Sequence, residues 1–210
     1  MNKTKLFVIF AAVLVLLFLT GSYRLYEIQG GSDAPTILLN DRVIVNKLAY
    51  DAVLPFTFKK LWTRKNPQRG DLILCTILQK KNAIKAVKRI TALPNDTFQI
   101  SEKKVIINGD TLHYEILNRN NFDAIPTRNK LGNVIAIEND GHTGHLVSWT
   151  QEDSTALNFG PITLKKDEYF LLGDNRDNSL DSRHFGPVKR DKIHGKLIHI
   201  FNTGSRVKGE

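Results

Sequence analysis

The sequence predicts a mainly β protein that is preceded by one N-terminal transmembrane helix. Short runs of β-branched and aliphatic residues, bounded by Gly, Pro, Asn or Asp, recur through most of the chain, as is typical of strands. An uncharged apolar stretch near the N-terminus has about the length of a membrane-spanning helix. With 210 residues, the chain has room for one substantial core, or for one core with a smaller lobe.

Six short apolar runs carry the strand prediction, because their lengths suit strands better than helices. They are residues 42–46, 71–77, 86–90, 98–100, 104–107 and 195–201. The pair Asn108-Gly109, which follows one of these runs, predicts a tight hairpin turn. Cys75 lies inside another run, so we expect a buried strand residue, and as the single cysteine it excludes an intramolecular disulfide.

The apolar stretch covers residues 6–23 and follows Lys3 and Lys5. At about 1.5 Å per residue it spans roughly 27 Å as a helix, near the lower limit for crossing a bilayer. We therefore expect residues 1–5 in the cytoplasm, residues 6–23 in the membrane and the remainder outside. A cleaved secretory signal is the alternative, since the small residues 20–22 follow the stretch, and it places the globular part on the same side.

The net charge of +9 raises the question of an anionic partner. The basic residues are scattered and no nucleic-acid-binding module is recognisable, so we expect no nucleic acid and favour the lipid bilayer as a partner. The segment 54–65 mixes aromatic and basic side chains, a combination suited to the headgroup boundary. The same segment could instead cover the core, and the sequence leaves both interpretations open.

The polar, Asn-rich stretch 116–160 differs in character from the strand-rich remainder. We interpret it as an inserted, variable lobe between the two parts of a core, residues 24–115 and residues 161–210. Within it, His142 and His145 have a spacing compatible with metal binding, but no Cys or carboxylate stands at supporting spacing. We expect no metal.

The run 173–188 is the densest cluster of charged and turn-forming residues in the chain, with three Asp, two Arg and two Ser. Such residues supply unusual backbone angles and interlocking carboxylate–guanidinium pairs. The apolar runs 169–172 and 185–188 flank it, and we predict both as strands. A loop held at both ends in this way is suited to chemistry or to positioning chemistry.

Two residues have surroundings suited to a catalytic pair. Ser32 follows two glycines and precedes Pro35, so we expect its hydroxyl on a tight, exposed turn. Lys88 has apolar strand neighbours, and partial burial would disfavour its ammonium form. A neutral amine can take the proton of a serine hydroxyl, the role of histidine in other serine hydrolases. Neither residue alone excludes an ordinary turn serine or an ordinary strand lysine.

Four motifs in chain order resemble those of the bacterial type I signal peptidases. They are Gly31-Ser32-x-x-Pro35-Thr36-Ile37-Leu38, Arg69-Gly70-Asp71, Lys88-Arg89 followed by Leu93-Pro94 and Asp96, and the run 173–186. The resemblance covers about residues 1–200, the apolar stretch included. It implies a largely antiparallel, sheet- or barrel-like β catalytic lobe with a smaller irregular β lobe. It also implies a single-pass protein of the inner (plasma) membrane with its catalytic domain on the extracytoplasmic side.

The same resemblance implies roles for individual residues. Ser32 matches the nucleophile and Lys88 the general base, while Ser179 matches the serine that orients the lysine amine. The implied reaction is cleavage of exported preproteins through an acyl-enzyme, with small substrate side chains at the first and third residues before the cut. Preprotein signal peptides are thus the expected partners, and no cofactor is expected.

Four charged residues of the run 173–186 match supporting positions of the family. Asp181 and Arg183 match an ion pair that supports the site, and Asp174 and Arg176 match structural positions of the same motif. We expect all four to support catalysis rather than to react. The sequence does not predict the oligomeric state.

Two residues depart from the family pattern. Asp33 stands where a methionine is usual, and Gly30 stands where some members have a serine. A carboxylate at Asp33 could keep Lys88 protonated, or it could point to solvent without effect. An active peptidase, a catalytically weakened paralogue that binds preproteins, and a maturation peptidase dedicated to one secretion or conjugation system therefore remain open.

Overall fold

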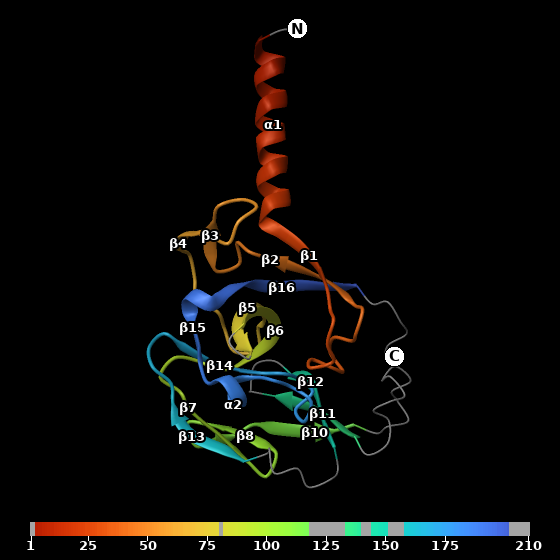
Figure 1. Ribbon diagram of the computed structural model, residues 1–210, viewed down its shortest axis with the longest axis vertical. Helices are drawn as coiled ribbons and strands as arrows, with labels where there is room; N and C mark the ends of the chain where they lie inside the picture. Colours follow the sequence, from red (N-terminus) through yellow and green to blue (C-terminus); the bar gives the residue numbers. More distant parts are fainter. Residues whose placement is uncertain (1–2, 80–81, 118–132, 140–143, 151–157, 202–210) are drawn as a thin grey trace.

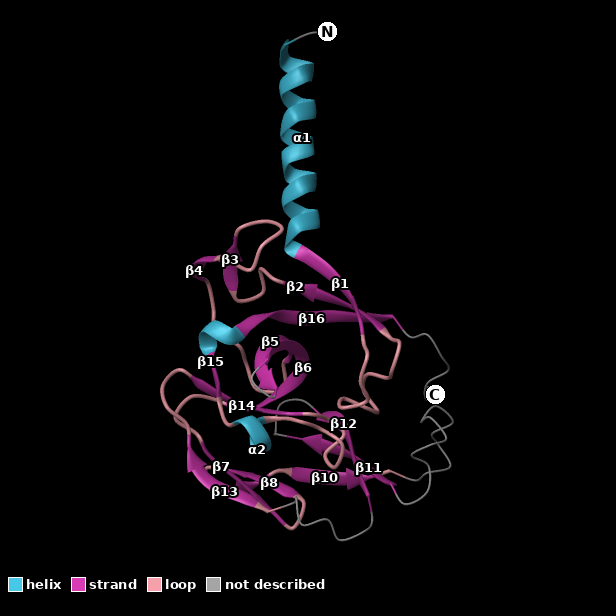
Figure 2. Cartoon of the chain, viewed as in Figure 1, coloured by secondary structure: helices cyan, strands magenta, loops and turns pink. Residues whose placement is uncertain are grey.

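The computed structural model describes residues 3–79, 82–117, 133–139, 144–150 and 158–201. Figure 2 shows that strands make up most of these residues, and that they form several sheets below a single long helix. Every strand pair that the sheets contain is antiparallel. The prediction of a mainly β, antiparallel protein is therefore confirmed.

The N-terminal helix α1 (Lys3–Ser22) projects away from the β body (Figure 1). It has 20 residues, and the large apolar side chains described along it are exposed. At its end Gly21 packs so closely on Pro55 that a β-carbon there would collide with it, which fixes the helix end against the segment 54–59. Within the described part of the chain, no helix is both long and apolar enough to cross a membrane.

The largest sheet has seven strands in the order β1-β2-β16-β5-β6-β14-β15. Their bounds are Tyr23–Glu27, Arg42–Asn46, Ile193–Phe201, Leu72–Gln79, Asn82–Ala92, Glu168–Leu172 and Val188–Lys189. β5 and β6 form a long curled hairpin at the centre (Figure 1). β1 lies at one edge of this sheet and β14 next to the other, yet the segment after β1 lies beside the segment after β14, because Asn175 donates hydrogen bonds to the carbonyls of Gly31 and Ser32.

Three smaller sheets complete the fold, with the orders β13-β7-β8-β9, β10-β11-β12 and β3-β4. The first contains Phe159–Thr163, Thr97–Ser101, Lys104–Ile107 and Asp110–Thr111, the second His113–Ile116, Asn133–Asn139 and Gly144–Thr150, and the third Asp51–Val53 and Lys60–Thr63. The tight hairpin predicted at Asn108-Gly109 joins β8 to β9, and both residues have the positive φ that such a turn needs.

Two features differ from the sequence-based expectations. The stretch 116–160 contains the regular strands β11 and β12, although the residues 118–132, 140–143 and 151–157 lie outside the described part. The run 185–188, predicted as a strand, begins at the end of helix α2 (Ser182–Phe185) and reaches a strand only at Val188. The reason is local: the Asp181 side chain accepts a hydrogen bond from the Arg183 backbone N–H and starts a helical turn.

Three clusters of buried side chains form the core, and one of them lies between the largest sheet and the β7–β8 hairpin. In that cluster Phe170 of β14 stacks on Phe98 with their ring centroids 4.0 Å apart, and Phe159 packs against both. Cys75 is buried in β5, as predicted. Phe170 is fully buried three residues before Gly173, so this packing fixes where the run 173–188 begins.

Replacing Phe170 by alanine should lower the free energy of unfolding by about 3–5 kcal/mol, because it removes a stacked, buried ring and leaves a cavity. Denaturant unfolding of the full chain measures the change. Phe201→Ala is the matched control, since Phe201 is 44% exposed, and its effect should stay within about 1 kcal/mol. Equal effects of the two substitutions would contradict the assignment of Phe170 to the core.

Candidate active site

Ser32 lies on the turn between β1 and β2, and other parts of the chain hold that turn in place. The Asn175 backbone N–H donates to the Ser32 carbonyl at 3.0 Å, and the Asn175 side chain donates to the Gly31 carbonyl at 3.0 Å. From β12, the Ser148 hydroxyl donates to the Ala34 carbonyl at 3.2 Å. The turn predicted from the glycines and proline is therefore positioned by the run 173–188 and by β12, not by its own residues alone.

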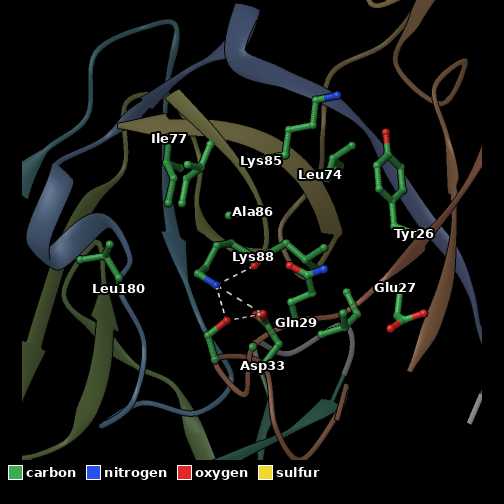
Figure 3. A pocket seen from close by; sticks show the side chains of 15 residues that line it. Tyr26, Glu27, Gln29, Asp33, Leu74, Ile77, Lys85, Ala86, Lys88 and Leu180 are labelled. Carbon is green, nitrogen blue, oxygen red and sulfur yellow. Dashed lines mark hydrogen bonds and ion pairs between the residues drawn. The ribbon is translucent and has the colours of Figure 1, made fainter. Parts of the chain in front are cut away.

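Lys88 lies on β6 opposite Ile73 of β5, and its side chain is buried. Its Nζ atom is 2.6 Å from Ser32 Oγ and 2.7 Å from the Val87 carbonyl oxygen. Figure 3 shows the lysine reaching toward the turn that carries Asp33. The structure thus brings together the two residues that the sequence singled out, although 56 positions separate them.

Asp33 is buried beside this pair and does not point to solvent. Its Oδ2 atom accepts a hydrogen bond from Ser32 Oγ at 2.7 Å and lies 3.3 Å from Lys88 Nζ (Figure 3). Burial raises the pKa of Asp33 to about 6, and the charge of Lys88 offsets part of that rise. Ser32, Asp33 and Lys88 therefore form a triangle of hydrogen bonds.

Ser179 is buried close to the turn, but it does not contact the lysine amine. The contacts of Lys88 Nζ are with Ser32, Asp33 and the Val87 carbonyl, whereas the Ser179 hydroxyl lies beside the Asp181 carboxylate and helps to lower the pKa of Asp181. Gly173 lies between the Ser32 carbonyl and Ser179, and a β-carbon there would collide with both. The glycine therefore allows the close approach of the two segments.

Asp181 and Arg183 form the ion pair expected within the run 173–188. Arg183 donates to both carboxylate oxygens of Asp181 at 2.8 Å, and the Gly173 backbone N–H donates to the same carboxylate at 3.1 Å. Burial opposes the ionisation of Asp181, but the hydrogen bonds and charge of Arg183 outweigh it and lower the pKa. Arg183 also donates to the Arg176 carbonyl, so the pair connects residues 181–183 with the earlier part of the run.

Asp174 is paired with Arg89, the residue next to Lys88. Arg89 Nε and Nη2 donate to the two carboxylate oxygens at 2.8 and 2.6 Å, and both side chains are buried. Burial opposes ionisation of Asp174, but the charge and hydrogen bonds of Arg89 lower its pKa. This bidentate pair fixes the start of the run 173–188 to strand β6.

Arg176 is paired with Glu138, a residue that the sequence did not single out. Its guanidinium donates to the two carboxylate oxygens at 2.8 and 2.7 Å, and Glu138 is 1% exposed. Burial opposes ionisation of Glu138, but Arg176 and a contact from His145 lower its pKa. The available signal was the apolar run 134–137 directly before Glu138, which is typical of a buried strand rather than of an irregular lobe.

A cleft of about 530 Å³ opens onto the Ser32–Asp33–Lys88 triangle. Its walls include Leu74, Ala86 and Leu180, whose side chains lie around the triangle in Figure 3. Across the described residues, no group of three His, Cys, Asp or Glu side chains is placed to hold a metal ion. The cleft is mainly apolar, with Glu27, Gln29 and Lys85 also on its walls, and it reaches the serine hydroxyl, the Asp33 carboxylate and the buried amine.

The antiparallel β fold and a turn serine hydrogen-bonded to a buried strand lysine make a serine hydrolase of the Ser–Lys type the candidate class of protein. Comparison with known families makes this specific. The model of the family described as "Signal peptidase, peptidase S26" matches residues 1–202. The chain belongs to this family.

Curated relatives agree with that membership. A protein named signal peptidase I P from Bacillus subtilis subsp. natto is 32% identical over 204 residues, which cover 96% of this chain and 89% of the relative. A signal peptidase I from Pseudomonas fluorescens is 32% identical over 188 residues, or 84% of this chain. The matched region is 63% of that relative's length, so the chain spans less than two thirds of it.

A solved structure from Enterococcus faecalis V583, described as a signal peptidase I, is also similar in sequence. The two share 25% sequence identity, with 64% of this chain and 98% of that chain covered and a TM-score of 0.37.

Replacing Glu138 by glutamine should lower the free energy of unfolding by about 3–5 kcal/mol, because it leaves the buried guanidinium of Arg176 without its counter-charge. Chemical denaturation of the full chain measures this. Glu115→Gln on the neighbouring strand β10 is the matched control, since Glu115 is exposed, and it should change little. A cost for Glu138→Gln no larger than that of the control would show that the pair does not stabilise the fold.

The same carboxylate predicts how stability depends on pH. The pKa of Glu138 is lower in the folded chain than in the unfolded chain, so its contribution is present above about pH 4.3 and is lost as the pH falls further. The loss of stability on acidification should therefore be shallower in Glu138→Gln than in the wild type. Unfolding curves collected from neutral to acidic pH test this, and parallel curves would contradict it.

Proposed function

We propose that the chain is a membrane-bound serine endopeptidase that cleaves N-terminal signal peptides from exported preproteins, with Ser32 as nucleophile and Lys88 in the base. The observation that supports this most directly is the 2.6 Å contact between Ser32 Oγ and Lys88 Nζ, with the amine buried at the end of an apolar cleft. Membership of the signal peptidase family supports the same activity and the same class of substrate.

The proposed reaction is acyl transfer in two steps. The Ser32 hydroxyl loses its proton to the base as Oγ attacks the scissile carbonyl, and the base then gives a proton to the leaving amine nitrogen. Water enters, loses a proton to the same base and releases the acyl group, which returns Ser32 to its hydroxyl form. Backbone N–H groups of the turn, including that of Ser32, would stabilise the oxyanion.

The remaining predicted site residues have supporting roles in this proposal. Asp181 with Arg183, and Asp174 with Arg89, hold the run 173–188 against the nucleophile turn through buried ion pairs. Arg176 does the same toward β11 through Glu138. Pairs of this kind fix geometry, because a displaced partner would leave a buried charge unpaired.

Ser179 would act on the amine only after a change in the site. Its hydroxyl is buried near the turn, but Asp33 and the Val87 carbonyl accept hydrogen bonds from Lys88 at present. Ser179 is therefore proposed as an alternative acceptor for the lysine amine during the reaction cycle.

The shape of the cleft is consistent with an extended substrate that has small side chains near the cut. Its lining combines aliphatic residues of β5 and β6 with residues of the segment after β1. An extended peptide there could pair with exposed backbone groups while short side chains enter the apolar wall. This supports preprotein signal peptides as the substrates.

The proposed location is the bilayer surface, with α1 as a single membrane anchor and the β body on the extracytoplasmic side. The support for this location is the uncharged stretch 6–23, which as a helix would extend for roughly 27 Å, although among the described residues no helix has both the length and the hydropathy of a membrane span. The β3–β4 hairpin lies beside the end of α1 (Figure 1), and Phe56 and Trp62 are exposed on it. Lys59 and Lys65 flank these rings, which suits the headgroup region.

A weakened paralogue that binds preproteins without cleaving them is the second candidate. The contact between Asp33 and Lys88 favours it, because a nearby carboxylate favours the ammonium form, which cannot act as a base. The two candidates differ in whether Ser32 forms an acyl-enzyme.

Ser32→Ala and Lys88→Ala should each reduce preprotein cleavage by roughly a thousand-fold or more, since each removes one member of a unit that acts together. Cleavage of a purified preprotein by the full chain in lipid vesicles measures this. Ser101→Ala and Lys104→Ala are the matched controls on β7 and β8, away from the cleft, and should retain wild-type rates. Retained turnover in either site variant would refute the assignment, and a wild type without turnover would favour the weakened paralogue.

Ala12→Arg should reduce membrane integration, because a charge near the middle of a spanning helix costs about 2.5–3.5 kcal/mol on insertion. Alkaline carbonate extraction of membranes that carry the full chain separates integrated from released protein. Lys5→Arg is the control, since it keeps a positive charge at the helix end. Equal release of both variants would contradict the anchor.

A further inference from the structure

The Ser32 hydroxyl has a defined direction in this site. A serine hydroxyl carries one proton and can donate one hydrogen bond. Here it donates to Asp33 Oδ2 at 2.7 Å and accepts from Lys88 Nζ at 2.6 Å. The proton that must leave Ser32 during attack therefore points at the carboxylate, not at the amine.

The contacts of Lys88 indicate which protonation form the geometry accommodates. Nζ lies within donor distance of three oxygens, which belong to Ser32, Asp33 and the Val87 carbonyl. Three acceptors match the three N–H donors of an ammonium group, whereas a neutral amine has two. With Asp33 ionised beside it, the resting pair consists of an ammonium and a carboxylate. This pair can take up one more proton, which converts the carboxylate into a neutral carboxylic acid.

We propose that Asp33 is a catalytic residue of this chain, and that the general base is the Asp33–Lys88 pair, with the carboxylate receiving the Ser32 proton while the ammonium stabilises the forming oxygen nucleophile. This rests on the proposed peptidase function and names the base within it.

The protons balance over the cycle. In acylation the Ser32 O–H bond breaks as the bond from Oγ to the carbonyl carbon forms, and the proton moves to Asp33 Oδ2. When the C–N bond breaks, the Lys88 ammonium gives a proton to the leaving amine, and the pair again holds one proton. In deacylation a water gives a proton to the pair as its oxygen bonds to the acyl carbon. The pair then returns a proton to Ser32 Oγ as the bond between Oγ and the acyl carbon breaks.

The surroundings make Asp33 a stronger base than an exposed carboxylate. It is buried, and its Oδ1 has no hydrogen-bond partner in the described part of the chain, so protonation relieves an incompletely solvated charge. Burial raises its pKa to about 6, with Lys88 opposing and Asp174 adding to the rise. General bases are most effective when their pKa is near the working pH, which a carboxylate of this kind approaches.

The other titratable and charged groups near Asp33 do not compete for this proton. Asp174 is held ionised by its bidentate contact with Arg89, and Arg89 remains a cation. The thiol of Cys75 is buried, which raises its pKa to about 12 and keeps it neutral. Asp33 is thus the group beside Ser32 whose protonation changes near neutral pH.

Asp33→Asn is the informative substitution, because it keeps the shape and an oxygen acceptor but cannot take a proton. At pH 7 it should lower kcat/KM for preprotein cleavage by at least about tenfold. The wild-type rate should fall as the pH drops through about 6, where Asp33 becomes protonated. In the variant this acidic limb should move away from about pH 6, because the carboxyl group whose titration produces it is absent. Asp110→Asn, at an exposed residue of β9, is the matched control and should match the wild type.

The rate of covalent labelling of Ser32 by a serine-reactive fluorophosphonate, followed over the same pH range, is measured beside cleavage. The same displacement of the acidic limb is expected in labelling. If the labelling rate shows this acidic limb but no preprotein is cleaved, the proposed peptidase function is wrong and the assignment of the base stands. Cleavage with an unchanged limb, or with Asp33→Asn as active as the wild type at pH 7 or more so, would overturn the base assignment and leave the function intact.

A lower unfolding midpoint for Asp33→Asn would confuse loss of base with loss of structure, so Asp33→Glu is the second variant. It keeps a carboxylate, and its acidic limb should stay with that of the wild type even if its rate is lower. If the acidic limb of the Asp33→Glu profile is displaced from that of the wild type in the same way as the limb of Asp33→Asn, the assignment is overturned.

Discussion

The buried ion pair between Arg89 and Asp174 is the contact on which the geometry of the site depends. Arg89 follows Lys88 on β6, and Asp174 is the second residue of the run 173–188, so one bidentate contact sets the distance between β6 and this run. Asn175, the next residue, donates to the backbone of the Ser32 turn. Displacing Asp174 would therefore move the nucleophile relative to Lys88 and would also leave a buried guanidinium unpaired, which is costly.

The charges around this contact fall into two groups with different physical consequences. Asp174, Asp181 and Glu138 each accept two hydrogen bonds from an arginine, so burial does not prevent them from remaining ionised. Asp33 faces a single lysine Nζ at 3.3 Å and has one oxygen without a partner, so burial dominates and raises its pKa. The paired carboxylates stabilise structure, and the incompletely paired one is able to exchange a proton near neutral pH.

The departure from the family pattern at Asp33 thus gains a physical interpretation from the structure. A methionine at this position could neither accept the Ser32 proton nor favour the ammonium form of Lys88. With Asp33 present, Ser179 has no contact with the amine, which the resemblance had implied. The two observations belong together, because an ammonium already bonded to three oxygens has no N–H left for the Ser179 hydroxyl.

The sequence by itself determined the strand-rich fold and the Asn108-Gly109 hairpin, and it singled out Ser32, Lys88 and the run 173–188 as a candidate site. Local turn chemistry, short apolar runs and ordered motifs are written in consecutive residues. The partner of Arg176 and the orientation of Asp33 were decided by the tertiary structure alone. Glu138 lies 38 positions from Arg176, and Asp33 lies 55 positions from Lys88. Contacts over such separations depend on which strands pair and in which register, and a short-range pattern does not specify a strand's partner.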